Sequence, residues 1–150
     1  MEFNTLNDIL EFAIGEEEAA VNFYTMLAGQ SKNEEIKAVF VSFAKEEMGH
    51  KARLTGVRET GLNDLGGTPV KDLKIADYLV DISPRPDMPY PEALILAMKK
   101  EKAAFRLYSA LSERVTDPAH KQLFSLLAQE EARHKLRFEL EYDEHVLKEN

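Results

Sequence analysis

Two Glu-x-x-His pairs are the residues of this sequence whose types and spacing suit metal chemistry. Glu47 and His50 form one pair, and Glu131 and His134 form the other. Residues three apart on a helix share a face, so each pair can present a carboxylate and an imidazole together. Both groups bind iron, manganese and zinc. A single pair would be weak support for a metal site, because acidic helices commonly carry such residues in solvent.

The two pairs belong to an internal repeat. When the sequence is shifted by 84 residues, residues 10–54 align with 94–138 without a gap, and about a third of the aligned positions are identical. The alignment also matches Glu17 with Glu101, each 30 residues before the glutamate of its pair. Such a repeat is far more specific than one pair alone. Each half of the chain is therefore predicted to form the same helical hairpin.

Apolar residues recur in steps of three and four through both halves, as they do along the inward face of a helix. Glu17 interrupts this stripe in the first helix, and Glu47 and His50 interrupt it in the second. The spacing predicts helices over residues 3–29, 32–60, 90–115 and 117–147.

Local signals indicate where these helices begin. Ser31 with Glu34 three residues later suits a capping box at the start of the second helix. Asp117 before Pro118 suits an N-cap followed by proline in the first turn, and Pro91 is expected to open the third helix in the same way.

The segment between the halves, residues 61–90, contains several glycines and prolines and is predicted to be a long crossover. A short helix over Leu73–Val80 is expected within it. The predicted fold is all-α: an antiparallel four-helix bundle in one domain over residues 1–150, with hairpins at 3–60 and 90–147 and one long crossover between the second and third helices.

Composition restricts the classes of function. The 150 residues carry a formal net charge of −8 and no cysteine. An acidic chain without a basic stripe repels nucleic acid, and the lack of cysteine excludes disulfides, thiolate metal sites and iron–sulfur clusters. No apolar run is long enough to span a membrane, and the N-terminus lacks a secretory signal pattern. A cytoplasmic location is expected.

The glutamates of the apolar stripes require a neutralising cation. Four inward carboxylates at one level of a bundle are costly to desolvate unless a cation lies among them. Two divalent ions balance four carboxylates, and two neutral imidazoles leave this balance unchanged. The predicted metal ligands are Glu17, Glu47, His50, Glu101, Glu131 and His134. Two iron ions are expected, with manganese or zinc as possible substitutes.

The sequence resembles the rubrerythrin branch of the ferritin-like superfamily over nearly its whole length. The resemblance rests on Glu17-x-x-Ala20-x-x-x-Tyr24 before Glu47-x-x-His50, and on Glu101-x-x-Ala104-x-x-x-Tyr108 before Glu131-x-x-His134. It implies a ferritin-like four-helix bundle with a di-iron centre. It also implies that Glu47 and Glu131 bridge the two irons, while Glu17 with His50 and Glu101 with His134 complete the two ends.

The resemblance further implies a redox protein that reduces hydrogen peroxide or dioxygen. Full-length rubrerythrins carry a cysteine-ligated rubredoxin domain, which these residues lack, so a separate electron donor such as a rubredoxin-like protein is expected. Rubrerythrins also carry an extra carboxylate one turn after the third-helix glutamate, where this sequence has Ala104; the site here is therefore more symmetric. The alternative function is an iron-binding ferroxidase or iron-buffering protein, and a third is a metal-bound scaffold without turnover.

The remaining polar and aromatic residues have ordinary interpretations beside any functional one. Tyr24 and Tyr108 follow Glu17 and Glu101 by two turns and could hydrogen-bond a ligand carboxylate or pack as core aromatics. Other residues are expected outside the site, on the surface or in structural roles: Glu46, Glu130, His120 and His145. A homodimer is expected, because amphipathic helices often leave an apolar stripe for a second copy.

Overall fold

A computed structural model describes residues 5–31, 33–61, 78, 80, 82 and 84–144 of the chain. These residues form four helices, α1 (Leu6–Gln30), α2 (Glu34–Gly61), α3 (Tyr90–Arg114) and α4 (Pro118–Tyr142), and none of them belongs to a β-strand. The predicted helices match these to within a few residues. The residues expected to be helical before position 5 and after position 144 lie outside the described part of the chain.

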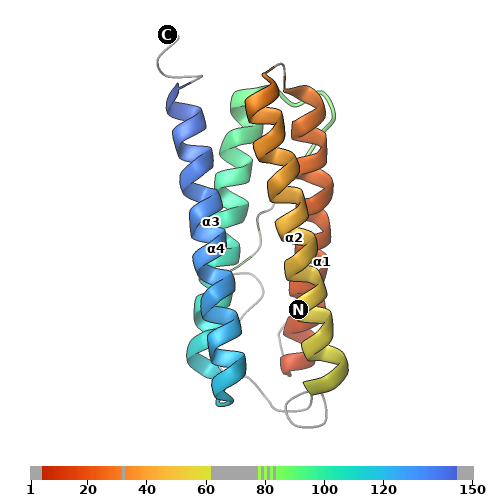
Figure 1. Ribbon diagram of the computed structural model, residues 1–150, viewed down its shortest axis with the longest axis vertical. Coiled ribbons are helices and arrows are strands. Elements are labelled where there is room, and N and C mark those ends of the chain that lie inside the picture. The colour runs from red at the N-terminus through yellow and green to blue at the C-terminus, as the bar shows by residue number, and fades with distance from the viewer. Residues whose placement is uncertain are drawn as a thin grey trace. The chain divides into compact units, whose positions relative to one another are not determined.

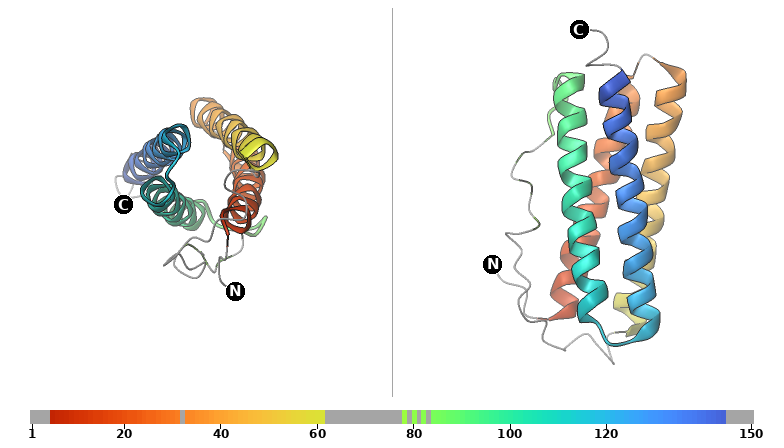
Figure 2. Two further views of the ribbon diagram at one scale, coloured as in Figure 1. Left: turned by 90° about the horizontal axis from the view of Figure 1, so that it is seen from below. Right: turned by 90° about the vertical axis from the view of Figure 1, so that its left-hand side faces the viewer.

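The helices are grouped in two compact units, residues Met1–Lys74 and Ile75–Asn150. In each unit two helices run antiparallel and pack along their length, α1 against α2 in the first and α3 against α4 in the second (Figures 1 and 2). Each half of the repeat is thus a helical hairpin with a short turn. The single domain over residues 1–150 stays a prediction.

The predicted crossover and its short helix fall largely outside the described residues. Of Leu73–Val80, the structure describes Tyr78 and Val80, and neither is helical.

Side-chain caps explain where the first hairpin's helices begin. The Thr5 hydroxyl accepts the Asp8 amide at 3.2 Å, and the Asp8 carboxylate accepts the Thr5 amide at 3.1 Å, so the chain becomes helical at Leu6. At α2, Asn33 Oδ1 accepts the amides of Glu35 at 2.8 Å and Ile36 at 3.3 Å. The predicted capping box at Ser31 and Glu34 is therefore wrong.

Ser31 instead ends α1. Its backbone amide donates to the carbonyls of Leu27 and Ala28, and its hydroxyl donates to the carbonyl of Asn33 at 3.2 Å. Asn33 has the shorter path to the first free amides of α2, because it stands directly before the first helical residue.

The start of α4 was predicted correctly. Asp117 Oδ1 accepts the amides of Ala119 at 2.8 Å and His120 at 3.1 Å, and Pro118 is the first helical residue. α3 begins at Tyr90, as the predicted range 90–115 has it, and Pro91 is its second residue instead of the expected first. The N-cap residue, Pro89, makes no side-chain hydrogen bond.

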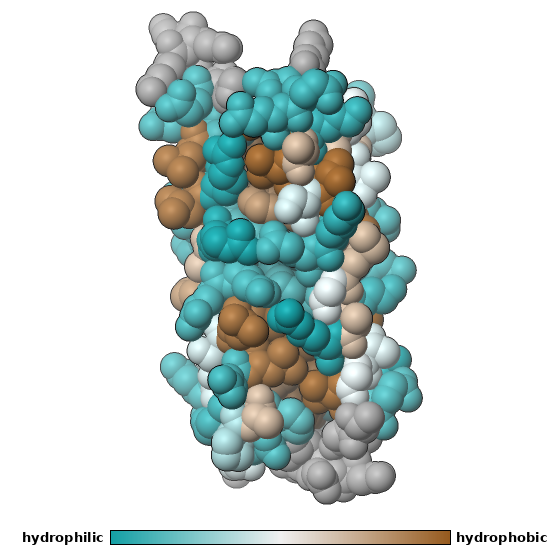
Figure 3. Space-filling model, in the orientation of Figure 1, coloured by the Kyte–Doolittle hydropathy of each residue, from teal (hydrophilic) through white to brown (hydrophobic). Residues whose placement is uncertain are grey.

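Each hairpin buries one apolar stripe. In the first unit the fully buried large side chains include Ile9, Leu10, Phe23, Leu27, Phe40 and Leu54, and in the second unit Leu94, Leu96, Phe124 and Phe138. Hydrophilic residues cover most of the face shown in Figure 3, with smaller hydrophobic areas between them. Among the described residues, no helix combines the length and the apolarity that crossing a bilayer would require.

Candidate metal centre

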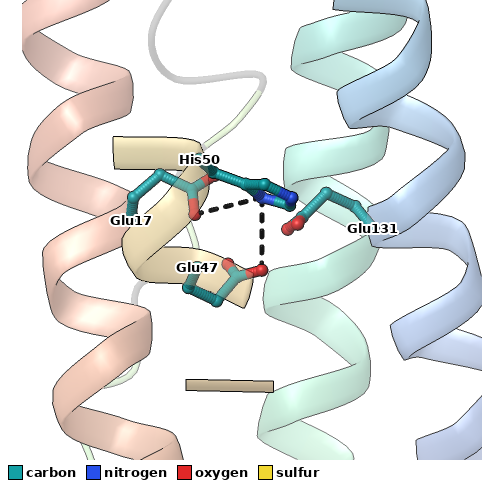
Figure 4. A group of neighbouring side chains, drawn as sticks. All are labelled: Glu17, Glu47, His50 and Glu131. Carbon is teal, nitrogen blue, oxygen red and sulfur yellow. Dashed lines mark ion pairs between the residues drawn. The ribbon is translucent and has the colours of Figure 1, made fainter. Parts of the chain in front are cut away.

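The first hairpin brings Glu17, Glu47 and His50 into one buried cluster. Glu17 comes from the middle of α1, and Glu47 and His50 lie one turn apart on the inward face of α2. The His50 Nδ1 atom lies 3.5 Å from Glu17 Oε2 and 3.4 Å from Glu47 Oε1 (Figure 4). The three side chains expose at most 2% of their surface. Two carboxylates and one imidazole nitrogen therefore converge out of solvent.

The second hairpin repeats this arrangement with Glu101 on α3 and Glu131 and His134 on α4. The His134 Nδ1 atom lies 3.7 Å from Glu101 Oε1 and 3.9 Å from Glu131 Oε1. These side chains are at most 1% exposed. The sequence repeat and the geometry therefore agree: in each hairpin a histidine Nδ1 faces carboxylates of two glutamates.

The spacing of these atoms fits metal coordination. Metal–nitrogen and metal–oxygen bonds of about 2.1 Å put two ligands of one ion roughly 3 Å apart at a right angle and about 4.2 Å apart in line. The four measured separations, 3.4–3.9 Å, fall between these limits. They are longer than most direct hydrogen bonds. In both clusters, each residue offers one ligand atom within 4.8 Å of the others.

The charges of the clusters also favour a cation. Each hairpin buries two carboxylates beside one imidazole, and removing carboxylates from water is costly without a compensating positive charge. No lysine or arginine in the described ranges is buried. Oxygen ligands with one imidazole nitrogen suit iron, manganese and zinc. The residues in each hairpin thus fit a divalent ion, and all six predicted ligands lie in one or other of the two clusters.

Tyr24 and Tyr108 are fully buried, and their rings pack against aromatic residues of the neighbouring helix. The Tyr24 ring meets Phe43 edge-on with centroids 6.4 Å apart, and the Tyr108 ring stacks on Phe124 at 6.5 Å. This packing agrees with the interpretation as core aromatics. A hydrogen bond from either phenol to a ligand carboxylate stays a prediction.

The residues expected outside the site are not members of either cluster. Glu46 and Glu130 are half-buried rather than fully exposed, because each stands one step around the helix from an inward ligand. His120 is half-buried in the first turn of α4. His145 lies outside the described residues.

Sequence reasoning missed one buried acid, Glu141, which is 3% exposed in the last turn of α4. Its Oε2 accepts a hydrogen bond from the Tyr90 hydroxyl at 2.5 Å. Burial raises the pKa of Tyr90, as do the hydrogen bond and the charge of Glu141, while Arg137 lowers it by less. The inward stripe that includes His134 and Phe138 continues to Glu141 at the next helical step. This spacing could have identified Glu141 as a buried residue.

The comparisons with known proteins agree with this combination of helices and carboxylate–histidine clusters. The sequence profile of the rubrerythrin family matches residues 8–142, and the chain belongs to this family. No curated protein is significantly similar to it in sequence.

Two solved structures are similar to this chain over most of its length. One, described as a ferritin-like diiron-carboxylate protein of Thermotoga maritima, is 26% identical, with a TM-score of 0.79 over 97% of this chain and 98% of that one. The other, a hypothetical protein of Pyrococcus furiosus, is also 26% identical, with a TM-score of 0.75 over 93% of this chain and 89% of that one. The predicted family and the predicted all-α, ferritin-like bundle class are confirmed.

Proposed function

We propose that the two clusters together hold one di-iron centre, and that the protein uses it to reduce hydrogen peroxide or dioxygen. Glu47 and Glu131 would be shared between the two ions, while Glu17 and His50 would complete the ligands of one and Glu101 and His134 those of the other. The balance is H2O2 + 2 e⁻ + 2 H⁺ → 2 H2O, or O2 + 4 e⁻ + 4 H⁺ → 2 H2O.

One observation carries this proposal: the same buried triad of two carboxylate oxygens around a histidine Nδ1 occurs in both hairpins, with separations of 3.4–3.9 Å. Two equivalent half-sites in one chain imply two ions with equivalent ligands. The family assignment supports a joint centre, as does the similarity to a diiron-carboxylate protein over 97% of the chain.

The residues of this chain contribute binding, charge balance and exclusion of water. Four carboxylates balance two divalent ions, so the loaded site would be neutral. The Nδ1 atoms of His50 and His134 face the carboxylates. Coordination of an ion through Nδ1 would require a neutral imidazole with its proton on the other ring nitrogen. A bound iron pair supplies two one-electron redox changes at a single site. The surrounding apolar side chains keep bulk water away from it.

The proposed reaction needs a source of electrons outside these residues. The 150 residues contain no cysteine, so they hold no rubredoxin-type iron site. A small one-electron carrier, such as a rubredoxin-like protein, is the proposed donor, and two of its turnovers would reduce one peroxide.

The test is anaerobic loading with ferrous iron and counting of bound metal, followed by mixing with peroxide or with dioxygen under excess chemical reductant. We expect about two irons per chain, oxidation to a coupled ferric pair, and repeated consumption of oxidant. Preference for one oxidant would separate a peroxidase from an oxidase.

Two other results would contradict the proposal. Uptake of many ferric ions per chain after a single oxidation would support the ferroxidase or iron-buffering alternative. Ferrous iron that binds but stays unchanged with both oxidants would support a metal-bound scaffold.

A further inference from the structure

The expectation that the chain lacks a basic stripe is wrong for α3, whose outward side is a positively charged surface on an acidic protein. It consists of Ile95, Lys99, Lys102, Phe105 and Arg106, hereafter the basic α3 face. Steps of four, three and four residues join positions 95, 99, 102 and 106, which places them on one side of the helix. All five side chains are exposed, including 37% of Ile95 and 39% of Phe105. The whole chain nevertheless carries a formal charge of −8.

None of the residues that the structure describes forms an ion pair with the positive charges of this face. Lys99 and Lys102 make no ion pair with any residue that the structure describes. Arg106 lies 6.0 Å from the centre of the Tyr78 ring, a cation–π contact that leaves its charge in place. Between residues 93 and 112 the only acid is Glu101, which is buried. Counted over the described part of the chain, the face therefore has a net positive charge.

The repeat shows that this charge is particular to the second hairpin. The α1 residue equivalent to Lys102 is Glu18, whose carboxylate pairs with Lys51 Nζ on α2 at 3.3 Å. The equivalent of Lys51 is Lys135, so the second hairpin has lysines at both positions. Lys135 pairs instead with Glu139 on its own helix, at 2.9 Å. The charge at this position is thus reversed within an otherwise similar repeat.

The other positions of the face also differ from their equivalents on α1. Ile95 replaces Glu11 and Lys99 replaces Gly15, so the first change removes a negative charge and the second adds a positive one. Phe105 replaces Val21, which enlarges the apolar side chain without changing the charge. A surface with two large apolar side chains among positive charges can contact a partner through the apolar groups and orient it through the charges.

The basic α3 face also lies close to a proposed ligand. Lys102 directly follows Glu101, and the helix directs one side chain outward and the other into the buried cluster. A partner on this face would be separated from Glu101 by the thickness of one helix, roughly 10 Å. That is a short path for an electron.

We infer that the basic α3 face is the docking surface for an acidic protein that delivers electrons to the metal centre. This inference rests on the proposed function, because it names the site where the donor of that reaction binds. The lysines steer the acidic donor and fix its orientation, and Ile95 and Phe105 provide the apolar contact.

The test measures binding of the iron-loaded full chain to an acidic rubredoxin, used as the probe, at low salt. K99E/K102E reverses two charges of the face. K37E/K45E is the matched control, since Lys37 and Lys45 are exposed on α2 and their reversal changes the net charge equally. We expect the dissociation constant to rise about tenfold or more in K99E/K102E and to change less than about twofold in the control. The dissociation constant of K99Q/K102Q should lie between that of the unchanged protein and that of K99E/K102E.

Equal effects of the two reversals, or no effect of either, would overturn the inference, because a general charge effect would then suffice. So would self-association that K99E/K102E alone abolishes, or stronger binding to phosphatidylserine vesicles than to the probe. Peroxide turnover with a chemical reductant is measured in parallel. If turnover is absent while the charge-dependent binding remains, the proposed function fails and the docking surface stands.

Discussion

In each hairpin a histidine nitrogen stands between two carboxylates that come from different helices. His50 Nδ1 and His134 Nδ1 each lie within 3.9 Å of two carboxylate oxygens, at almost complete burial. Six charged or polar side chains at such positions lower the stability of a protein unless a bound cation offsets the free energy lost when they are removed from water. Their role is therefore functional, and single substitutions should show what each side chain contributes to metal binding.

Replacing Glu47 or Glu131 with alanine should reduce bound iron from about two ions per chain to one or none. Each change removes a carboxylate proposed to be shared by both ions, and loss of one ligand of a closed set weakens binding strongly. Metal analysis after anaerobic loading gives the result. Glu46→Ala and Glu130→Ala are matched controls and should keep about two ions; equal metal content in all four variants would mean that the wrong carboxylates were chosen.

At the level of the helices, two features decide how each hairpin is held together: the caps that start the helices and the polar contact that joins α3 to α4. The Asn33 side chain caps α2 in place of the expected Ser31. The Tyr90–Glu141 hydrogen bond connects the first residue of α3 with the last turn of α4. Both contacts can be tested by single substitutions.

Asn33→Ala should lower the free energy of unfolding by about 1 kcal/mol, because the amides of Glu35 and Ile36 lose their acceptor. Urea denaturation at neutral pH measures the change. Ser31→Ala is the control and should cost less than half as much, since the Ser31 hydroxyl donates only to a neighbouring carbonyl. A larger loss of stability in Ser31→Ala than in Asn33→Ala would indicate that Ser31 is the cap of α2.

Tyr90→Phe should lower the free energy of unfolding by about 1–2 kcal/mol at pH 7, because the buried Glu141 carboxylate loses a hydrogen-bond donor. The variant should also lose less stability than the wild type at alkaline pH. The pKa of Tyr90 is raised above 10.0 in the folded protein, so its contribution is complete below the unfolded value and falls as the pH rises beyond it.

Denaturation at pH 7 and at pH 11 checks both parts of this prediction. Tyr142→Phe, near the same end of α4, is the control and should leave the free energy of unfolding unchanged at both pH values. An unchanged stability of Tyr90→Phe at pH 7 would show that the contact does not hold the two helices together.

At the scale of the whole molecule, the question is whether the two hairpins act as one centre or as two separate sites. Among the described residues, each hairpin contributes three of the six clustered side chains. A joint centre shares ligands, so binding in one hairpin would depend on the other.

His134→Ala should therefore abolish the spectroscopic signature of a coupled ferric pair completely, although it leaves every residue of the first hairpin intact. His50→Ala should do the same from the other hairpin. Mössbauer or absorption spectra of the iron-loaded, oxidised variants test this. His120→Ala is the control, since His120 belongs to neither cluster. Retention of half of the iron with unaltered spectra would indicate two independent sites.

The sequence alone determined the helices and the six clustered residues, because the apolar periodicity, the Glu-x-x-His spacing and the ungapped repeat are patterns that one helix or one hairpin expresses locally. The tertiary structure decided how those residues meet: the 3.5 Å approach of Glu17 to His50 depends on how α1 packs against α2. It also decided that Glu141 is buried against Tyr90, 51 positions away, and that Lys102 has no ion-pair partner among the described residues. Contacts between distant residues depend on packing and leave no periodic signal along the chain.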